Sequence, residues 1–268
     1  RSRHNEKSIG PMLEALRDWE YPSGLERTTF KETAVKSRMA AGPAVLFVGD
    51  SHLEQYSPRI VHLLDRGLAH RKSVIFLTSP GCSPIPGSAQ INPYAAERCP
   101  AFRVEVEKLA ADPGIGVIVV GGAWNLYFLD SSSHFAGDVD VESEFAGIAR
   151  FLSRVAANKK VYFVLDNPSG QQFQPRNFFA GSRLTTLTAK PFQETIPLDD
   201  KQAALRDRLA KLATEAGATV IDPVAAICPR DQCRAFTTEG KPIYKDDHHY
   251  RASYARKHMD FIDITLVE

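Results

Sequence analysis

The sequence lacks an excess of either charge, and it lacks any long uninterrupted apolar run. Its 268 residues include 33 basic and 32 acidic side chains, and no basic cluster stands out along the chain. This balance gives no support to a nucleic-acid-binding surface, which needs a local excess of lysine and arginine. No stretch approaches the roughly 18–20 apolar residues of a membrane helix, and the N-terminus has no apolar signal core.

The chain also lacks an initiating methionine, since it begins at Arg1. We therefore expect it to be an excised portion or a mature form of a longer protein. Its composition, 43% hydrophobic and 24% charged, is that of an ordinary globular protein. The length suits one large domain, or one and a half, and such a chain buries about 70% of its unfolded surface. Such a core needs no metal or cofactor for stability, and we predict neither.

Cysteine is scarce, and the four cysteines fall into two local pairs, Cys82/Cys99 and Cys228/Cys233. Each pair flanks proline-containing sequence without a secondary-structure pattern. This favours two disulfides, and hence an oxidising compartment, although four cysteines allow three pairings. Zinc ligation and free thiols in a cytosolic protein are the alternatives. Gaps of 16 and four residues fit no zinc ribbon or finger.

Apolar β-rich segments alternate with amphipathic helical segments from residue 44 onward. The predicted strands are Ala44–Val48, Ser73–Leu77, Val117–Gly121, Lys160–Leu165 and Ala218–Ile221. The predicted helices span about 53–66, 100–111, 141–157, 199–216 and 250–263. This alternation predicts βαβ units in an α/β fold, with a doubly wound, mostly parallel five-stranded sheet and helices on both faces.

Two further segments lack this alternation. Residues 1–42 are polar, with scattered apolar positions such as Leu16 and Trp19 at helical spacing. They predict a short amphipathic helix and a linker ahead of a catalytic domain over residues 43–268. Residues 166–197 have no clear period. An irregular segment of that length in a compact domain is typical of a functional or poorly ordered loop.

The apolar run that ends at Val48 is followed directly by Gly49-Asp50-Ser51-His52. A serine at this position lies beyond the carboxyl end of a strand, where doubly wound sheets bind ligands. Its backbone N–H opens the next helix and points toward a developing oxyanion. The alternative for this motif alone is an ordinary helix start, capped by Asp50 or Ser51.

Near the C-terminal end, Asp246 lies three residues before His249. This spacing lets the carboxylate accept a hydrogen bond from Nδ1 of His249 across a turn, which leaves Nε2 for Ser51. The three residues then provide an orienting carboxylate, a base and a nucleophile. His248 and His52 are the competing bases. A lysine occupies the position three before His248, and we expect His52 to point away from the adjacent serine.

These motifs resemble the SGNH hydrolase superfamily, and in particular the extracytoplasmic SGNH domain fused to bacterial membrane acyltransferases of the acyltransferase-3 family. The similarity rests on Gly-Asp-Ser-His, on Ser-Pro-Gly-Cys-Ser-Pro after the second strand, and on Cys-(four residues)-Cys followed by Tyr-x-Asp-x-x-His. It covers about 43–265. The resemblance implies O-acetylation of a cell-envelope glycan such as lipopolysaccharide O-antigen. A fused membrane portion would deliver the acetyl group on the periplasmic or extracytoplasmic side of the inner membrane.

The resemblance also implies two oxyanion donors besides the backbone of Ser51, one from a glycine and one from an asparagine. Gly81, after the second strand, and Asn125, after the third, are the candidates. The usual Gly-x-Asn-Asp pattern is changed here because Trp124 takes the expected asparagine position. Trp124 is therefore a candidate wall of the acyl or sugar pocket. An ordinary loop position is the alternative for the two donors.

The irregular segment supplies Gln172 and Arg176 as candidates for hydrogen bonds to a sugar, with a solvated loop as the alternative. The family pattern changes at Tyr250 and Arg251, where Leu-Ser is usual. We expect that change to alter helix packing more than chemistry. Two other functions fit the same residues. One is a secreted carbohydrate esterase with water as acceptor, and the other is a glycan-binding module with a vestigial triad.

Overall fold

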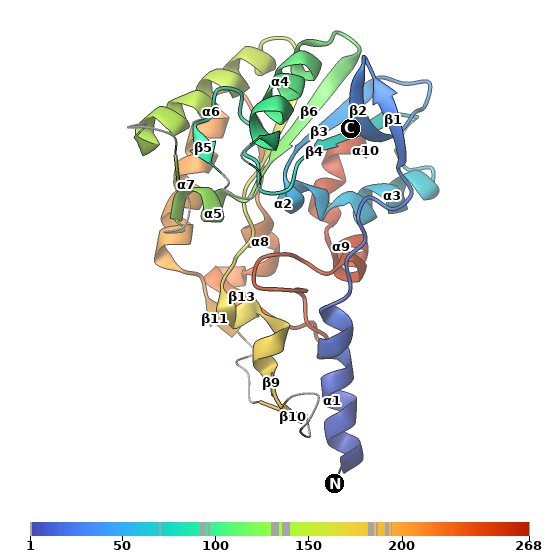
Figure 1. The fold of residues 1–268 in the computed structure, drawn as a ribbon, viewed down its shortest axis with the longest axis vertical. Helices are drawn as coiled ribbons and strands as arrows, with labels where there is room; N and C mark the ends of the chain where they lie inside the picture. The colour runs from blue at the N-terminus through green and yellow to red at the C-terminus, as the bar shows by residue number, and fades with distance from the viewer. Residues whose placement is uncertain are drawn as a thin grey trace.

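The structure is a computed structural model that describes residues 2–69, 71–91, 95, 97–129, 134–135, 140–181, 185, 187–190, 193, 195–267. Within these residues a seven-stranded sheet lies between two layers of helices (Figure 1). The strands, in spatial order, are β1 (Glu26–Phe30), β2 (Thr33–Arg38), β4 (Ser73–Thr78), β3 (Ala44–Gly49), β6 (Ile115–Gly121), β8 (Lys160–Val164) and β12 (Thr219–Ile221).

The last five strands of this order are parallel and coincide with the five predicted strands. The doubly wound, mostly parallel α/β fold is therefore confirmed. The chain places β4 on one side of β3 and then adds β6, β8 and β12 on the other side. The direction of winding thus reverses at β3, and the carboxyl end of β3 lies where such sheets bind their ligands.

Two antiparallel strands that the sequence did not predict extend the sheet at one edge. β1 and β2 form a hairpin, and β2 pairs antiparallel with β4. Almost every residue of β1 is exposed, and the buried positions of β2 include the polar Thr33 and Ser37. The hairpin therefore has no clear apolar alternation. Residues 26–38 belong to the sheet, although they fall in the span predicted as a linker.

Helices cover both faces of the sheet, as predicted. On one face lie α4 (Arg98–Ala111), α5 (Trp124–Leu129), α6 (Val141–Ala156) and α7 (Asp200–Glu215). On the other lie α2 (Ser51–Glu54), α3 (Ser57–Asp65), α8 (Pro223–Ile227), α9 (Ala252–His258) and α10 (Ile264–Val267). The N-terminal helix is α1 (Ser2–Ala15). No helix in the described part of the chain is long and apolar enough to cross a bilayer.

Two predicted helices differ in extent from the observed ones. The predicted helix 53–66 is divided into α2 and α3, since Pro58 opens the second helix. The predicted helix 250–263 ends at His258 and is followed by a 3₁₀ turn, η4 (Asp260–Ile262). These breaks leave α2 as a short helix whose main role is to position the residues that follow β3.

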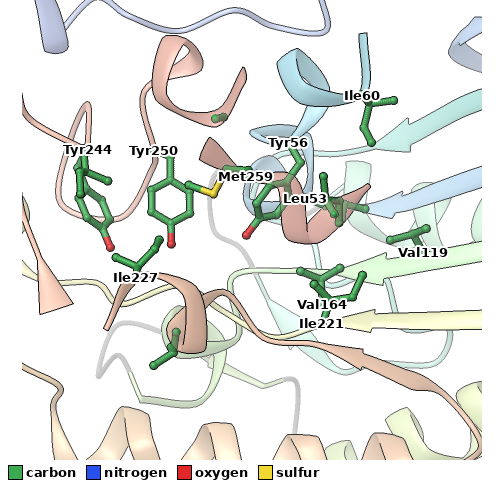
Figure 2. Close-up of a cluster of buried hydrophobic side chains, with 14 of the residues drawn as sticks. Leu53, Tyr56, Ile60, Val119, Val164, Ile221, Ile227, Tyr244, Tyr250 and Met259 are labelled. Carbon is green, nitrogen blue, oxygen red and sulfur yellow. The ribbon is translucent and has the colours of Figure 1, made fainter. Parts of the chain in front are cut away.

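An apolar core between the sheet and the α2–α9 layer holds α2 in place. Figure 2 shows Leu53 and Tyr56 among strand side chains that include Val119 and Val164, all of them buried. A side chain at Gly49 would come within 2.6 Å of the Leu53 Cβ. Glycine therefore lets α2 pack directly on the strands, and burial of Leu53 contributes about 2 kcal/mol to that contact.

Short elements, rather than one structureless loop, occupy the described parts of residues 166–197. They are the turns η1 (Gln171–Phe173) and η2 (Pro175–Phe178) and the strands β9 (Phe179–Ala180), β10 (Thr188–Ala189) and β11 (Thr195–Pro197). β9 pairs with β10, and β11 pairs with β13 (Gln232–Arg234), which follows η3 (Pro229–Asp231). In Figure 1 these strands gather with α1 in the lower part of the view. β5 (Gln90–Ile91) and β7 (His134–Phe135) form a separate pair.

Both predicted disulfides are present. Cys82 bonds to Cys99, and Cys228 bonds to Cys233. The first joins the turn after β4 to the start of α4, and the second closes the turn between α8 and β13. All four sulfur atoms are therefore bonded to one another in pairs, and the local pairing is confirmed.

Candidate active site

Ser51 is the first residue of α2 and follows β3 at the reversal of winding. Asp50 is the N-cap of this helix, and its carboxylate accepts a hydrogen bond from the backbone N–H of His52 at 2.7 Å. The second oxygen accepts from the backbone N–H of Ala123 at 2.8 Å and from the hydroxyl of Tyr127. Complete burial raises the pKa of Asp50. Asp50 therefore fixes the start of α2 against the loop between β6 and α5.

The structure brings Ser51, His249 and Asp246 together. Nε2 of His249 lies 2.8 Å from Oγ of Ser51, and Nδ1 lies 2.9 Å and 3.2 Å from the two carboxylate oxygens of Asp246. Oδ1 of Asp246 also accepts the backbone N–H groups of His248 and His249 at 3.1 Å and 2.6 Å. The loop thus folds around the carboxylate and holds the imidazole toward the serine.

The protonation of this group suits general base chemistry. Burial disfavours the charged form of His249 and lowers its pKa to about 4, although the hydrogen bond to Asp246 acts in the opposite direction. Burial opposes ionisation of Asp246 as well, but the hydrogen bond and charge of His249 hold the pKa of this carboxyl well below its usual range. At neutral pH the imidazole is therefore neutral and ready to accept a proton.

A second carboxylate–imidazole pair lies next to the first and is more deeply buried. Nδ1 of His52 is 2.6 Å from Oδ1 of Asp166, and both side chains are only 3% exposed. Burial acts to lower the pKa of His52, but nearby carboxylates, Asp166 foremost, outweigh it and raise the pKa to about 9. Oδ2 of Asp166 accepts the backbone N–H of Asn125 at 2.7 Å. The pair thus joins α2 to α5 and to the end of β8.

His248 lies next to both pairs. Its ring centroid is 4.1 Å from that of His249 and 5.3 Å from that of His52, and its Nδ1 lies 2.6 Å from a carboxylate oxygen of Asp247. The other oxygen of Asp247 accepts from the side-chain amide of Gln171 at 2.6 Å. Asp247 therefore orients His248 and joins η1 to the loop of His249.

Two groups of side chains at this place have metal-ligating chemistry. The first is His52, His248 and His249, and the second is Asp246, Asp247 and His248; the ligand atoms in each group lie within 4.8 Å of one another. Several of these ligand atoms already have hydrogen-bond partners. Nδ1 of His52 pairs with Asp166, and the two ring nitrogens of His249 pair with Asp246 and Ser51. The arrangement fits a hydrogen-bonded network better than a metal site.

Trp19 also reaches the site, although the sequence did not predict it there. Its ring stands edge-on to the His249 ring, with centroids 5.0 Å apart and planes at 70°. Nζ of Lys245 lies 4.9 Å from the centre of the Trp19 ring. Trp19 and Asp166 are thus residues that sequence patterns missed, and His52 was considered only as a competing base. Their partners lie far away in the chain, so no local spacing identifies them.

The predicted oxyanion donor Asn125 already has protein partners. Its side-chain amide donates to the backbone oxygen of Asn167 at 3.0 Å and lies 3.3 Å from the amide oxygen of Gln202. Since its backbone N–H donates to Asp166, a role at an oxyanion requires an exchange of partners. Gly81 lies in the turn after β4 with a positive φ of 73°. Its role as a donor stays a prediction.

The structure corrects the prediction that Trp124 walls a substrate pocket. Trp124 is 1% exposed, its indole N–H donates to the carbonyl of Val164 at 2.9 Å, and its ring stacks on Phe163. It is a core residue because its ring packs inward from the start of α5. Gln172 and Arg176 are exposed on η1 and η2, and their contact with a sugar stays a prediction.

Ser51 lies two residues beyond β3, at the reversal of winding of a parallel sheet. The family model described as "SGNH domain (fused to AT3 domains)" matches residues 20–263. The chain therefore belongs to this family, and the resemblance seen in the sequence is confirmed.

A solved structure shows the same fold, and a second one is less similar. The periplasmic domain of a lipopolysaccharide acetyltransferase from Salmonella ser. Paratyphi A is similar with a TM-score of 0.59 and 10% sequence identity, over 85% of each chain. A carbohydrate acetylesterase family member from Sinorhizobium meliloti is similar with a TM-score of 0.49 and 16% identity, over 84% of this chain and 99% of that one. A comparison with curated proteins finds no match.

Proposed function

We propose that this domain is an enzyme that transfers an acyl group, most simply acetyl, to a hydroxyl of a bacterial cell-envelope glycan. The observation that carries the proposal is the hydrogen-bonded chain from Ser51 through His249 to Asp246. Fusion to AT3 domains in this family supports a membrane acyltransferase partner that supplies the acyl group. The lipopolysaccharide acetyltransferase domain with the same fold supports a glycan acceptor and a periplasmic location. The two disulfides also support an oxidising compartment.

In the first step Ser51 becomes acylated. Nε2 of His249 takes the hydroxyl proton as Oγ of Ser51 attacks the acyl carbon, and Asp246 stabilises the imidazolium that forms. The tetrahedral intermediate then breaks its bond to the leaving group, which takes the proton from His249. The backbone N–H of Ser51, at the first turn of α2, donates to the oxyanion.

In the second step the acyl group passes to the glycan. His249 takes the proton of a sugar hydroxyl, whose oxygen attacks the acyl-Ser51 carbon. Collapse of the second tetrahedral intermediate releases the sugar ester, and His249 returns the proton to Oγ of Ser51. Water in place of the sugar gives hydrolysis, so transfer depends on positioning of the acceptor and on exclusion of water.

The test is the reaction of the purified domain with p-nitrophenyl acetate, with and without oligosaccharides released from lipopolysaccharide by mild acid. Ser51→Ala is compared with wild type, and Ser153→Ala, an exposed serine on α6, is the matched control. We expect acetylated sugar from wild type and Ser153→Ala only. Fast hydrolysis with a rate that does not change when the oligosaccharide is added supports an esterase instead. Equal turnover by wild type and Ser51→Ala would contradict the proposed nucleophile and favour a glycan-binding module.

A further inference from the structure

Trp19 stands beside the proposed catalytic base. The ring centroids of Trp19 and His249 are 5.0 Å apart, and the same imidazole lies 2.8 Å from Oγ of Ser51. Trp19 is partly exposed to solvent. A large aromatic ring therefore borders the space in which a second substrate must approach acyl-Ser51.

The backbone next to Trp19 is fixed to the helix that follows His249. The carboxylate of Asp18 accepts from Nε of Arg251 at 2.8 Å and from the backbone N–H of Ser253 at 3.2 Å. The carbonyl of Asp18 accepts the backbone N–H of Ala252 at 3.1 Å. Asp18 thus caps the start of α9 and holds Trp19 against the loop that carries the base.

Further ion pairs fix the residues on either side of Trp19. Arg251 is 2% exposed and also donates to Glu14 at 2.9 Å, while Arg256 pairs with Glu20. We call residues 14–20, which these contacts bind to α9, the N-terminal strap. A side chain held this way loses little conformational entropy when a ligand packs on it, which favours binding.

We propose that Trp19 is the platform on which the sugar acceptor packs, an inference that rests on the proposed acyl transfer. A pyranose ring has one face rich in C–H bonds and a rim of hydroxyls. Its C–H face packs on the exposed part of the indole, and a rim hydroxyl then reaches Nε2 of His249, which Ser51 releases once it is acylated. The indole supplies a large rigid apolar surface and excludes water from one side of the ester.

The matched control is another aromatic residue of the same region. Tyr21 is 40% exposed, but its ring lies against Nζ of Lys36, 3.2 Å from the ring centre, instead of against His249. Loss of Tyr21 removes a comparable exposed ring without changing the surroundings of the base. Tyr21→Ala therefore measures the effect of losing an exposed aromatic ring that does not contact the base.

The first experiment separates acylation from transfer. In Trp19→Ala we expect a burst of p-nitrophenolate, which shows that Ser51 is still acylated. The ratio of transfer to hydrolysis with lipopolysaccharide-derived oligosaccharides falls about tenfold and the acceptor KM rises, as expected for one aromatic contact. Trp19→Phe recovers part of the loss, and Tyr21→Ala keeps the wild-type ratio. An unchanged ratio in Trp19→Ala overturns the inference while the proposed function stands.

The second experiment needs no catalysis. The chain has two tryptophans, and Trp124 is buried. The same oligosaccharides, titrated into the Ser51→Ala protein, are expected to change tryptophan fluorescence saturably, and Trp19→Phe in that background abolishes the change. A titration without any saturable change overturns the inference even if the acylation chemistry is correct. If the wild-type protein is not acylated at Ser51, by contrast, the proposed function itself is wrong.

Discussion

In the Asp246–His249 pair the imidazole has its pKa lowered to about 4, whereas in the Asp166–His52 pair the imidazole has its pKa raised to about 9. The side chain of His52 is 3% exposed and that of His249 is 14% exposed, and both bind a carboxylate through Nδ1, so the hydrogen bond alone does not decide the direction of the pKa shift. Burial lowers the pKa of both rings. For His52 the charges of three carboxylates, those of Asp166, Asp50 and Asp246, overcome it. For His249 the neighbouring histidines add to the effect of burial instead.

The difference gives the two pairs different tasks. A neutral His249 next to Ser51 accepts a proton, and a charged His52 beneath it supports the start of α2 through Asp166. Burial is the main reason why His249 is neutral, and the nearby positive charge on His52 acts in the same direction. We therefore expect substitutions in the Asp246–His249 pair to lower activity and substitutions in the Asp166–His52 pair to lower stability.

Removal of the base is expected to have the largest effect. His249→Asn should lower the rate of Ser51 acylation by roughly 10⁴–10⁶, because the hydroxyl then has no proton acceptor. His52→Asn should lower it by about tenfold or less, since His52 reaches Ser51 only through its neighbours. Single-turnover kinetics with p-nitrophenyl acetate measure both. Equal losses would show that the two imidazoles share one task.

The next effect concerns the carboxylate of the Asp246–His249 pair. Asp246→Asn should lower the acylation rate by roughly 10³–10⁴, since an amide no longer holds the imidazole in the productive tautomer. Its free energy of unfolding should fall by less than that of Asp166→Asn, because an amide oxygen still accepts the backbone N–H groups of the loop. Kinetics and urea unfolding on one preparation test both parts, and strong unfolding of this variant would refute the division of tasks.

The carboxylate of the buried pair should show the reverse pattern. Asp166→Asn leaves a buried imidazole without its counter-charge and is expected to lower the free energy of unfolding by about 3 kcal/mol. Asp263, whose pair with Arg59 is partly exposed, is the control, and Asp263→Asn should cost about 1 kcal/mol or less. Urea unfolding measures both variants. Similar losses in the two would mean that burial does not distinguish these pairs.

The smallest effects are those of pH on stability, and they have opposite signs. The folded pKa of His52 lies above its ordinary 6.5, so its contribution is complete below 6.5 and is lost as pH rises through about 9. The folded pKa of His249 lies below 6.5, so its contribution is present above 6.5 and is lost as pH falls toward 4. Burial raises the pKa of Glu54 to about 8, so its contribution is complete below 4.5 and is lost as pH rises through about 8.

Urea unfolding of wild type, His52→Asn and His249→Asn between about pH 4 and 10 separates these contributions. The difference between wild type and His52→Asn should shrink only on the alkaline side, and that for His249→Asn only on the acid side. Glu54 is common to all three proteins and cancels. A difference that shrinks on the same side for both variants would contradict the assigned pKa directions.

The sequence was sufficient for the features that rest on local patterns. The parallel strands are apolar runs that a doubly wound sheet buries on both faces, and Asp246 and His249 are joined by a single turn. Both disulfides bracket short loops. Arg251, which departs from the family pattern, was expected to alter helix packing, and it binds the N-terminal strap to α9.

Features that depend on distant contacts could not be predicted. His52 and Asp166 lie 114 residues apart, and neither position has a pattern that marks it as half of a pair. Trp19 belongs to a polar N-terminal segment whose contact with His249 exists only in the folded molecule. Trp124 was misassigned for a related reason, because a tryptophan next to a site motif fits both a pocket wall and a core residue. Only burial separates the two.

The most direct test of the central claim is mass spectrometry of the domain, quenched after brief exposure to p-nitrophenyl acetate and digested. The account predicts one added acetyl group on the peptide that carries Ser51, formed slowly in Asp246→Asn and absent in His249→Asn. It also predicts a level within about tenfold of wild type in His52→Asn once the variant is shown to be folded. Acetylation spread over surface lysines, with none on Ser51, would contradict the account.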